Sequence, residues 1–188
     1  MEAFLVSTGL VALAEMGDKT QLLSLLLAAK FRKPWPIVAG IFVATLANHA
    51  LAGALGAWIT QWLGADTLRW ILGVSFLVMA VWMLIPDKID EDEASTTSSR
   101  FGVFATTLVA FFLAEMGDKT QVATVMLAAR FDTWAPVVAG TTIGMMLANA
   151  PVVWFGERIT RLVPIRVVHV VSAIIFLVLG AAALLGAG

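Results

Sequence analysis

Two clusters of acidic, amide and ammonium side chains stand out in an otherwise apolar chain. Each has the sequence Glu-Met-Gly-Asp-Lys-Thr-Gln, and the two copies occupy residues 15–21 and 115–121. Carboxylates and carboxamides offer oxygen ligands, and the chain contains no cysteine to offer a thiolate. Such oxygen sets suit Ca²⁺, Mn²⁺ or Mg²⁺ and do not favour Cu⁺ or Zn²⁺. We therefore predict a divalent-cation site with ligands from both copies: Glu15, Asp18, Gln21, Glu115, Asp118 and Gln121.

The charge balance of the two copies fits one divalent cation. Their four carboxylates and two ammonium groups leave a formal charge of −2, which one such ion would neutralise. Two roles are open for Lys19 and Lys119. They could act as counter-ions when the cation is absent, or they could lose a proton and couple the cycle to protons, because a desolvated lysine changes its pKa readily.

Other polar residues are predicted to support this site. In a continuous helix Glu15 and Asp18 share a face with Lys19, which could pair with Glu15 at i,i+4. Thr20 joins that face only if the helix unwinds. The competing interpretation is that buried Glu–Lys pairs in the cluster are purely structural and hold the first and fourth helices together. For His49 we favour an interhelical hydrogen bond over a role as ligand or proton carrier. The supporting residues are Lys19, Thr20, Lys119, Thr120, Asn48 and Asn149.

Composition indicates an integral membrane protein. Apolar residues make up 60% of the chain and charged residues 13%, against about 45–50% and about 25% in soluble domains. A net charge of −1 argues against nucleic-acid binding. Hydropathy predicts an all-α membrane protein with six transmembrane helices, at residues 3–29, 36–63, 68–85, 101–129, 136–156 and 165–186.

The first and fourth predicted helices carry the two motifs near their middles. Both exceed the roughly 20 residues that a bilayer requires, so we expect them to tilt, kink or unwind. Six charged groups facing lipid at mid-membrane would be very costly. The motif side chains must therefore face one another or water.

The two halves of the chain repeat each other. A shift of one hundred residues aligns nine identical residues, 13–21 with 113–121. We divide the chain into a first three-helix repeat at 1–86, an acidic linker at 87–100 and a second three-helix repeat at 101–188. Because three crossings are an odd number, the second repeat must enter the membrane from the opposite side, which gives an inverted-topology repeat.

The distribution of basic residues predicts which side of the membrane each loop faces. The loops on one side of the membrane hold eight of them, and the opposite side holds only Arg69 and Arg130. Because basic loops face the cytoplasm, we expect a cytoplasmic linker and both termini outside. The eight residues are Lys30, Arg32, Lys33, Lys88, Arg100, Arg158, Arg161 and Arg166.

The doubled Glu-x-Gly-Asp-Lys-Thr motif resembles the signature of the Golgi-type Ca²⁺/Mn²⁺ cation antiporters, whose bacterial relatives include manganese exporters of the MneA type. The resemblance covers both halves of the chain. It implies six helices in inverted repeats, export of Mn²⁺ or Ca²⁺, and exchange against H⁺. It also implies that the acidic motif residues bind the cation. The short chain lacks the leader of eukaryotic relatives, so we expect a bacterial plasma membrane, the inner membrane of the cell.

These observations predict a secondary transporter and not an enzyme. It would need no cofactor, and its partners would be a divalent cation, protons and membrane lipid, with no nucleic acid. Oxygen ligands alone do not choose between Mn²⁺ and Ca²⁺, and Mn²⁺ is preferred on the resemblance. A passive divalent-cation channel and a non-transporting structural membrane protein remain as alternatives. The sequence does not give the oligomeric state.

Overall fold

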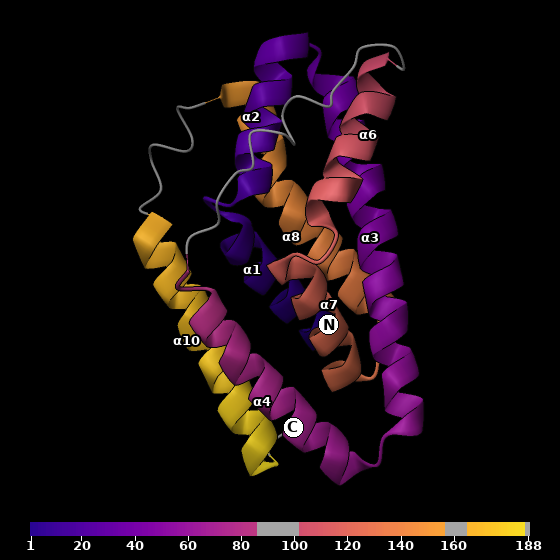
Figure 1. Ribbon diagram of the computed structural model, residues 1–188, viewed down its shortest axis with the longest axis vertical. Coiled ribbons are helices and arrows are strands. Elements are labelled where there is room, and N and C mark those ends of the chain that lie inside the picture. The colour runs from indigo at the N-terminus through magenta and orange to yellow at the C-terminus, as the bar shows by residue number, and fades with distance from the viewer. Residues whose placement is uncertain (86–101, 157–164, 187–188) are drawn as a thin grey trace.

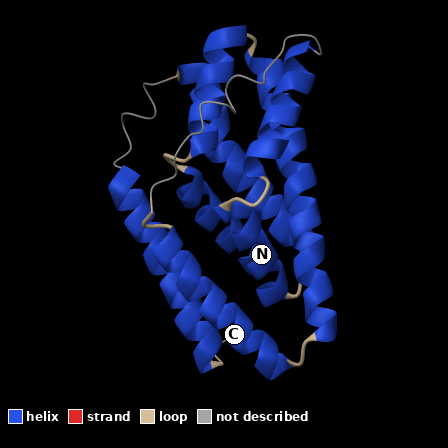
Figure 2. Ribbon diagram, in the orientation of Figure 1, coloured by secondary structure: helices blue, strands red, loops and turns tan. Residues whose placement is uncertain are grey.

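The computed structural model describes residues 1–85, 102–156 and 165–186. Within these ranges every regular element is an α-helix (Figure 2), which confirms the predicted all-α class for the described part of the chain. The predicted linker at 87–100 lies outside it, as do Arg158 and Arg161. The helices are α1 Glu2–Glu15, α2 Lys19–Phe31, α3 Pro34–Trp62, α4 Ala65–Trp82, α6 Gly102–Glu115, α7 Lys119–Phe131, α8 Trp134–Phe155 and α10 Ile165–Leu185.

Four helices are long and apolar enough to cross a membrane: α3, α4, α8 and the part of α10 from Arg166 to Leu185. They correspond to the second, third, fifth and sixth spans predicted from hydropathy. Large apolar side chains on their outer faces are exposed, among them Trp58, Val78 and Leu177. Lipid is the solvent that suits such faces. The chain is an integral membrane protein.

The first and fourth predicted spans are each divided into two short helices. One division separates α1 from α2 at residues 16–18, and the other separates α6 from α7 at 116–118. Gly17 and Gly117 have φ values of 85° and 77°, in the left-handed region where a side chain is strained. The expectation that these overlong segments kink or unwind is confirmed, and the unwound residues belong to the motifs.

The first helix of each half packs on the second helix of the other half. Helix α1 lies along α8, and α6 lies along α3 (Figure 1). Two glycines allow the close approach: a Cβ on Gly140 would lie 2.5 Å from the carbonyl oxygen of Phe4, and one on Gly40 would lie 2.9 Å from that of Phe104. Small residues permit such backbone contacts between helices. The same repeat positions therefore make the contact in both halves.

Helices α4 and α10, the last of each half, form a separate pair (Figure 1, magenta and yellow). Phe76 and Phe176 occupy matching repeat positions, and their buried rings lie 6.1 Å apart between centroids. Helix α4 also contacts α7. Helix α10 contacts α1, so the pair is joined to one helix that precedes a break and to one that follows a break.

Candidate metal centre

Each helix break is held by the glutamine that follows it. The N–H of Gly17 donates to Gln21 Oε1 at 3.0 Å, and the N–H of Gly117 donates to Gln121 Oε1 at 2.6 Å. Asp18 directly precedes α2 and Asp118 directly precedes α7, with backbone angles that agree within about a degree. The two motifs therefore adopt one local structure. In it the carboxamide oxygens predicted as metal ligands accept hydrogen bonds from the backbone of the break.

The breaks bring carboxylates of both halves together. One oxygen from each of Glu15, Glu115 and Asp118 lies within 4.8 Å of the other two. Both glutamates are fully buried, and Asp118 is 5% exposed. Buried carboxylates at this separation repel one another unless protons or a cation neutralise them. Oxygen ligands bind Ca²⁺ at about 2.3–2.6 Å, so three converging oxygens at this spacing suit one divalent ion.

Threonine hydroxyls orient the two glutamates. Thr20 Oγ1 donates to Glu15 Oε2 at 2.5 Å, and Thr120 Oγ1 donates to Glu115 Oε2 at 3.0 Å. These bonds depend on the break, because an unbroken helix would point each threonine away from its glutamate. Within the described part of the chain, Oε1 of each glutamate is buried and accepts no hydrogen bond. The Oε1 atoms are thus the glutamate oxygens available to a cation.

The two motif lysines occupy different environments. Lys19 Nζ lies 3.6 Å from Asp118 Oδ1 of the other half, whereas Lys119 Nζ donates to the carbonyl oxygen of Ile85 at 2.9 Å. The i,i+4 geometry considered for Glu15 and Lys19 does not apply, because α1 ends at Glu15 and α2 begins at Lys19. The contacts described here thus link Lys19 to a carboxylate of the other half and Lys119 to the end of the first half.

The two asparagines connect α3 and α8 to the motif helices. Asn48 Oδ1 accepts a hydrogen bond from Gln121 Nε2 at 2.6 Å, and Asn48 Nδ2 donates to the carbonyl oxygen of Phe112. In the other half, Asn149 Oδ1 accepts from Ser24 Oγ at 3.0 Å. Gln21 Nε2 donates to the carbonyl oxygen of Ala148 at 3.1 Å. These bonds place both asparagines one layer outside the converging carboxylates.

The sequence did not predict one member of this network, Ser24, and it predicted a hydrogen bond for His49 that the structure does not show among the described residues. Ser24 was not predicted, although residue 124 is also a hydroxyl residue and both lie one turn beyond the motif glutamine. That repeated hydroxyl was the available signal. The interhelical hydrogen bond predicted for His49 is wrong: the ring is fully buried, yet within the described residues neither nitrogen forms a hydrogen bond.

Comparison with known proteins identifies the family. A family model described as divalent cation/proton antiporter GDT1 matches residues 3–91 and 103–188, including both motifs. The chain belongs to the GDT1 family. The resemblance seen in the doubled motif is therefore confirmed, and so is the predicted class: a divalent-cation transporter and not an enzyme.

Relatives in the GDT1 family cover nearly the whole chain. A putative manganese exporter of Vibrio cholerae is 51% identical over 183 residues, which is 97% of this chain and 90% of the relative. A GDT1-like protein of Synechocystis is 24% identical and covers 94% of this chain and 93% of its own. The divalent cation/proton antiporter GDT1 of Saccharomyces cerevisiae is 22% identical, over 95% of this chain and 81% of its own. No solved structure matches the chain.

Proposed function

We propose that this protein exports a divalent cation from the cytoplasm in exchange for protons, with Mn²⁺ as the preferred ion and Ca²⁺ as the alternative. The observation that carries the proposal is the convergence of Glu15, Glu115 and Asp118 within 4.8 Å at two helix breaks. The names of the Vibrio and yeast relatives support manganese export and proton exchange.

The proposed topology has six crossings arranged as two inverted repeats, residues 1–86 and 101–188. Helices α1 and α2 together would form one interrupted crossing, and α6 and α7 another. The matching contacts of Gly40 and Gly140 support this arrangement. Support also comes from the two ends of the described chain, since Glu2 and Gly186 line one cavity. An even number of crossings requires both ends on one side, which basic residues predict to be the outside, opposite a cytoplasmic 87–100 linker.

In the proposed mechanism, protons and metal compete for the same carboxylates. A carboxyl group that takes up a proton loses the charge that attracts a cation, so proton entry from outside would release metal there. The broken helices would let the two halves rock about the buried site and expose it to each side in turn. The bacterial inner membrane would supply the inward proton gradient.

Lys19 would serve as a tethered counter-ion in this cycle. Its ammonium group lies 3.6 Å from Asp118, so it partly neutralises the carboxylates when the metal is absent. An arriving divalent cation supplies more charge and would displace it.

Ion flux in proteoliposomes tests the proposal. Mn²⁺ and Ca²⁺ would be added in turn to vesicles that contain a pH dye, with wild type compared with Glu15→Gln and Glu115→Gln. Asp132→Asn is the control, because Asp132 lies at the end of α7 and Asn tolerates its positive φ of 47°. We expect metal-driven proton movement in wild type and control, and its loss in both glutamate variants.

Each other outcome would favour a different function. Metal flux without proton movement would indicate a passive channel. No flux from folded wild-type protein would favour a non-transporting structural role. Flux of similar rate in both glutamate variants would show that the buried cluster is not the transport site.

A further inference from the structure

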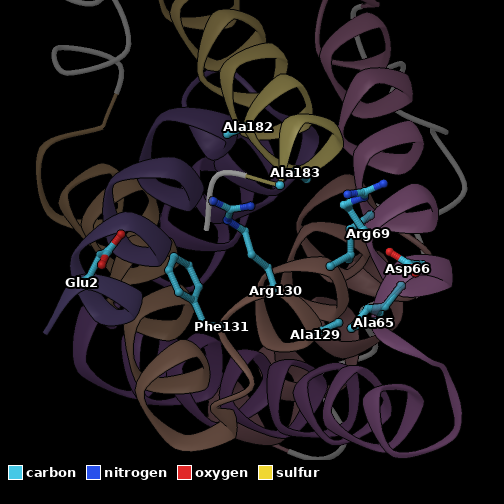
Figure 3. Close-up of a pocket in the computed structure, with 12 residues that line it drawn as sticks. Glu2, Ala65, Asp66, Arg69, Ala129, Arg130, Phe131, Ala182 and Ala183 are labelled. Carbon is cyan, nitrogen blue, oxygen red and sulfur yellow. The ribbon is translucent and has the colours of Figure 1, made fainter.

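A second polar site lies at the ends of four helices, away from the carboxylate cluster. A cavity of about 490 Å³ opens where the start of α1 and the start of α4 meet the ends of α7 and α10 (Figure 3). Glu2 lines it, and Glu15 is thirteen residues further along α1, a distance of about 20 Å at 1.5 Å per residue. The cavity is therefore separate from the proposed transport site.

Two arginines line this cavity. Arg69 comes from α4 and Arg130 from α7, and both side chains point towards the end of α10 that carries Ala182 and Ala183 (Figure 3). The Nε atom of each is buried and, within the described residues, donates no hydrogen bond. The Arg130 guanidinium carbon lies 5.9 Å from the centroid of the Phe131 ring. Paired guanidinium groups are suited to a phosphate group, because their N–H donors match its oxygens.

Two acidic residues of the cavity lining narrow the choice of ligand. Glu2 and Asp66 also line the cavity, on opposite sides of Arg130 (Figure 3), so the four groups carry no net formal charge. A simple anion would balance the arginines and leave both carboxylates without a cation. A zwitterion with a phosphodiester and a primary ammonium would bring a partner for the arginines and one for a carboxylate.

Position and apolar surface point to a lipid as the source of that zwitterion. The cavity lies at helix ends, where a membrane protein meets the head-group layer. Leu68 and Leu72 add an apolar side to the cavity next to Arg69. We propose that this cavity binds the head group of phosphatidylethanolamine, with Arg69 and Arg130 on the phosphate and with Asp66, which lies beside Arg69 (Figure 3), on the ammonium.

Native mass spectrometry of the delipidated full chain, without metal, tests this site. Phosphatidylethanolamine would be titrated against phosphatidylglycerol, which lacks the ammonium, and phosphatidylcholine, whose ammonium has no N–H. Inorganic phosphate would be added as a separate competitor. We expect phosphatidylethanolamine to bind about tenfold more tightly than either other lipid, and millimolar phosphate to leave its binding unchanged.

Matched variants separate this site from general lipid adhesion. The double variant Arg69→Gln/Arg130→Gln should weaken phosphatidylethanolamine binding at least about tenfold. The control Arg32→Gln/Lys33→Gln removes two exposed charges between α2 and α3 and should bind as wild type does. Ala65→Trp keeps every charge and places a large side chain on the cavity wall from an exposed position. It should also reduce binding.

Three results would overturn the proposal. If the arginine double variant binds phosphatidylethanolamine as tightly as wild type does, the two arginines do not bind the phosphate. Equal affinity for all three lipids would show that the cavity does not recognise the ethanolamine head group. Displacement of the lipid by inorganic phosphate would identify a free anion as the ligand. The assay contains no transported ion, so its failure would leave the transport proposal untouched.

Discussion

At the scale of single residues, the transport proposal depends on how each glutamate is held. A threonine hydroxyl fixes Oε2, and Oε1 remains as the oxygen directed at a cation. A carboxylate held in one orientation loses less entropy on binding a metal, and its hydrogen bond also stabilises the charged form. The motif threonine is thus a positioning residue for the adjacent ligand.

Removal of that hydroxyl should weaken metal binding without removing a ligand. Thr20→Val and Thr120→Val each delete a hydrogen bond to a charged group, worth about 1.5–3 kcal/mol, so we expect the KM for Mn²⁺ to rise about tenfold or more. Thr20→Ser and Thr120→Ser keep the donor and should remain close to wild type. Flux measured against Mn²⁺ concentration distinguishes these variants. Equal KM values for the valine and serine variants would contradict the positioning role.

Removal of the tethered ammonium should have the opposite effect. Lys19→Met deletes the positive charge 3.6 Å from Asp118, and an ion pair at this distance is worth on the order of 1–4 kcal/mol. Since the ammonium competes with the metal, we expect the Kd for Mn²⁺ to fall about tenfold. Weaker Mn²⁺ binding by Lys19→Met, measured by titration calorimetry, would show that the lysine assists the metal.

At the scale of helices, the contacts of α1 with α8 and of α6 with α3 hold the two halves together. Gly40→Ala and Gly140→Ala would place a Cβ against backbone oxygens at 2.9 and 2.5 Å, so each should lower the thermal unfolding temperature in detergent. Gly9→Ala is the matched control, because a Cβ there meets nothing within 4 Å. An unfolding temperature that falls as far for Gly9→Ala as for Gly40→Ala would contradict the close packing.

Much of this helix arrangement is predictable from the sequence. Nine identical residues at a spacing of one hundred predict two similar halves, and the excess length of the first and fourth spans predicts that they tilt, kink or unwind. The pattern does not choose among tilt, kink and unwinding. That choice follows from the positive φ of Gly17 and Gly117, a conformation that glycine permits and does not require.

Contacts between halves could not be predicted from local spacing. Helical periodicity places Lys19 near Glu15, whereas packing places it against Asp118 of the other half. Residue types alone also suggest that the carboxamide oxygens of Gln21 and Gln121 are free to bind a metal. In the structure each oxygen accepts a hydrogen bond from a backbone N–H of the unwound segment. Ligand chemistry was readable from residue types, but partners across the two halves depend on tertiary structure.

At the scale of the whole molecule, the proposed topology predicts which residues face each side of the membrane. The natural chain has no cysteine, so single cysteines can report it. Thr67→Cys, in the first turn of α4, should react with an impermeant maleimide added outside intact cells. Lys33→Cys, between α2 and α3, should react only after permeabilisation. Both positions are exposed. Labelling of both from the same side would contradict the topology.

The central claim is that one divalent cation binds between the two halves in competition with protons. Titration of purified protein with Mn²⁺, followed by electron paramagnetic resonance of the bound ion and by proton release in weak buffer, tests it most directly. We expect one Mn²⁺ per chain with release of protons, and loss of that binding in both Glu15→Gln and Glu115→Gln. If either variant binds Mn²⁺ with unchanged affinity, or if binding releases no protons, the shared carboxylate site is wrong.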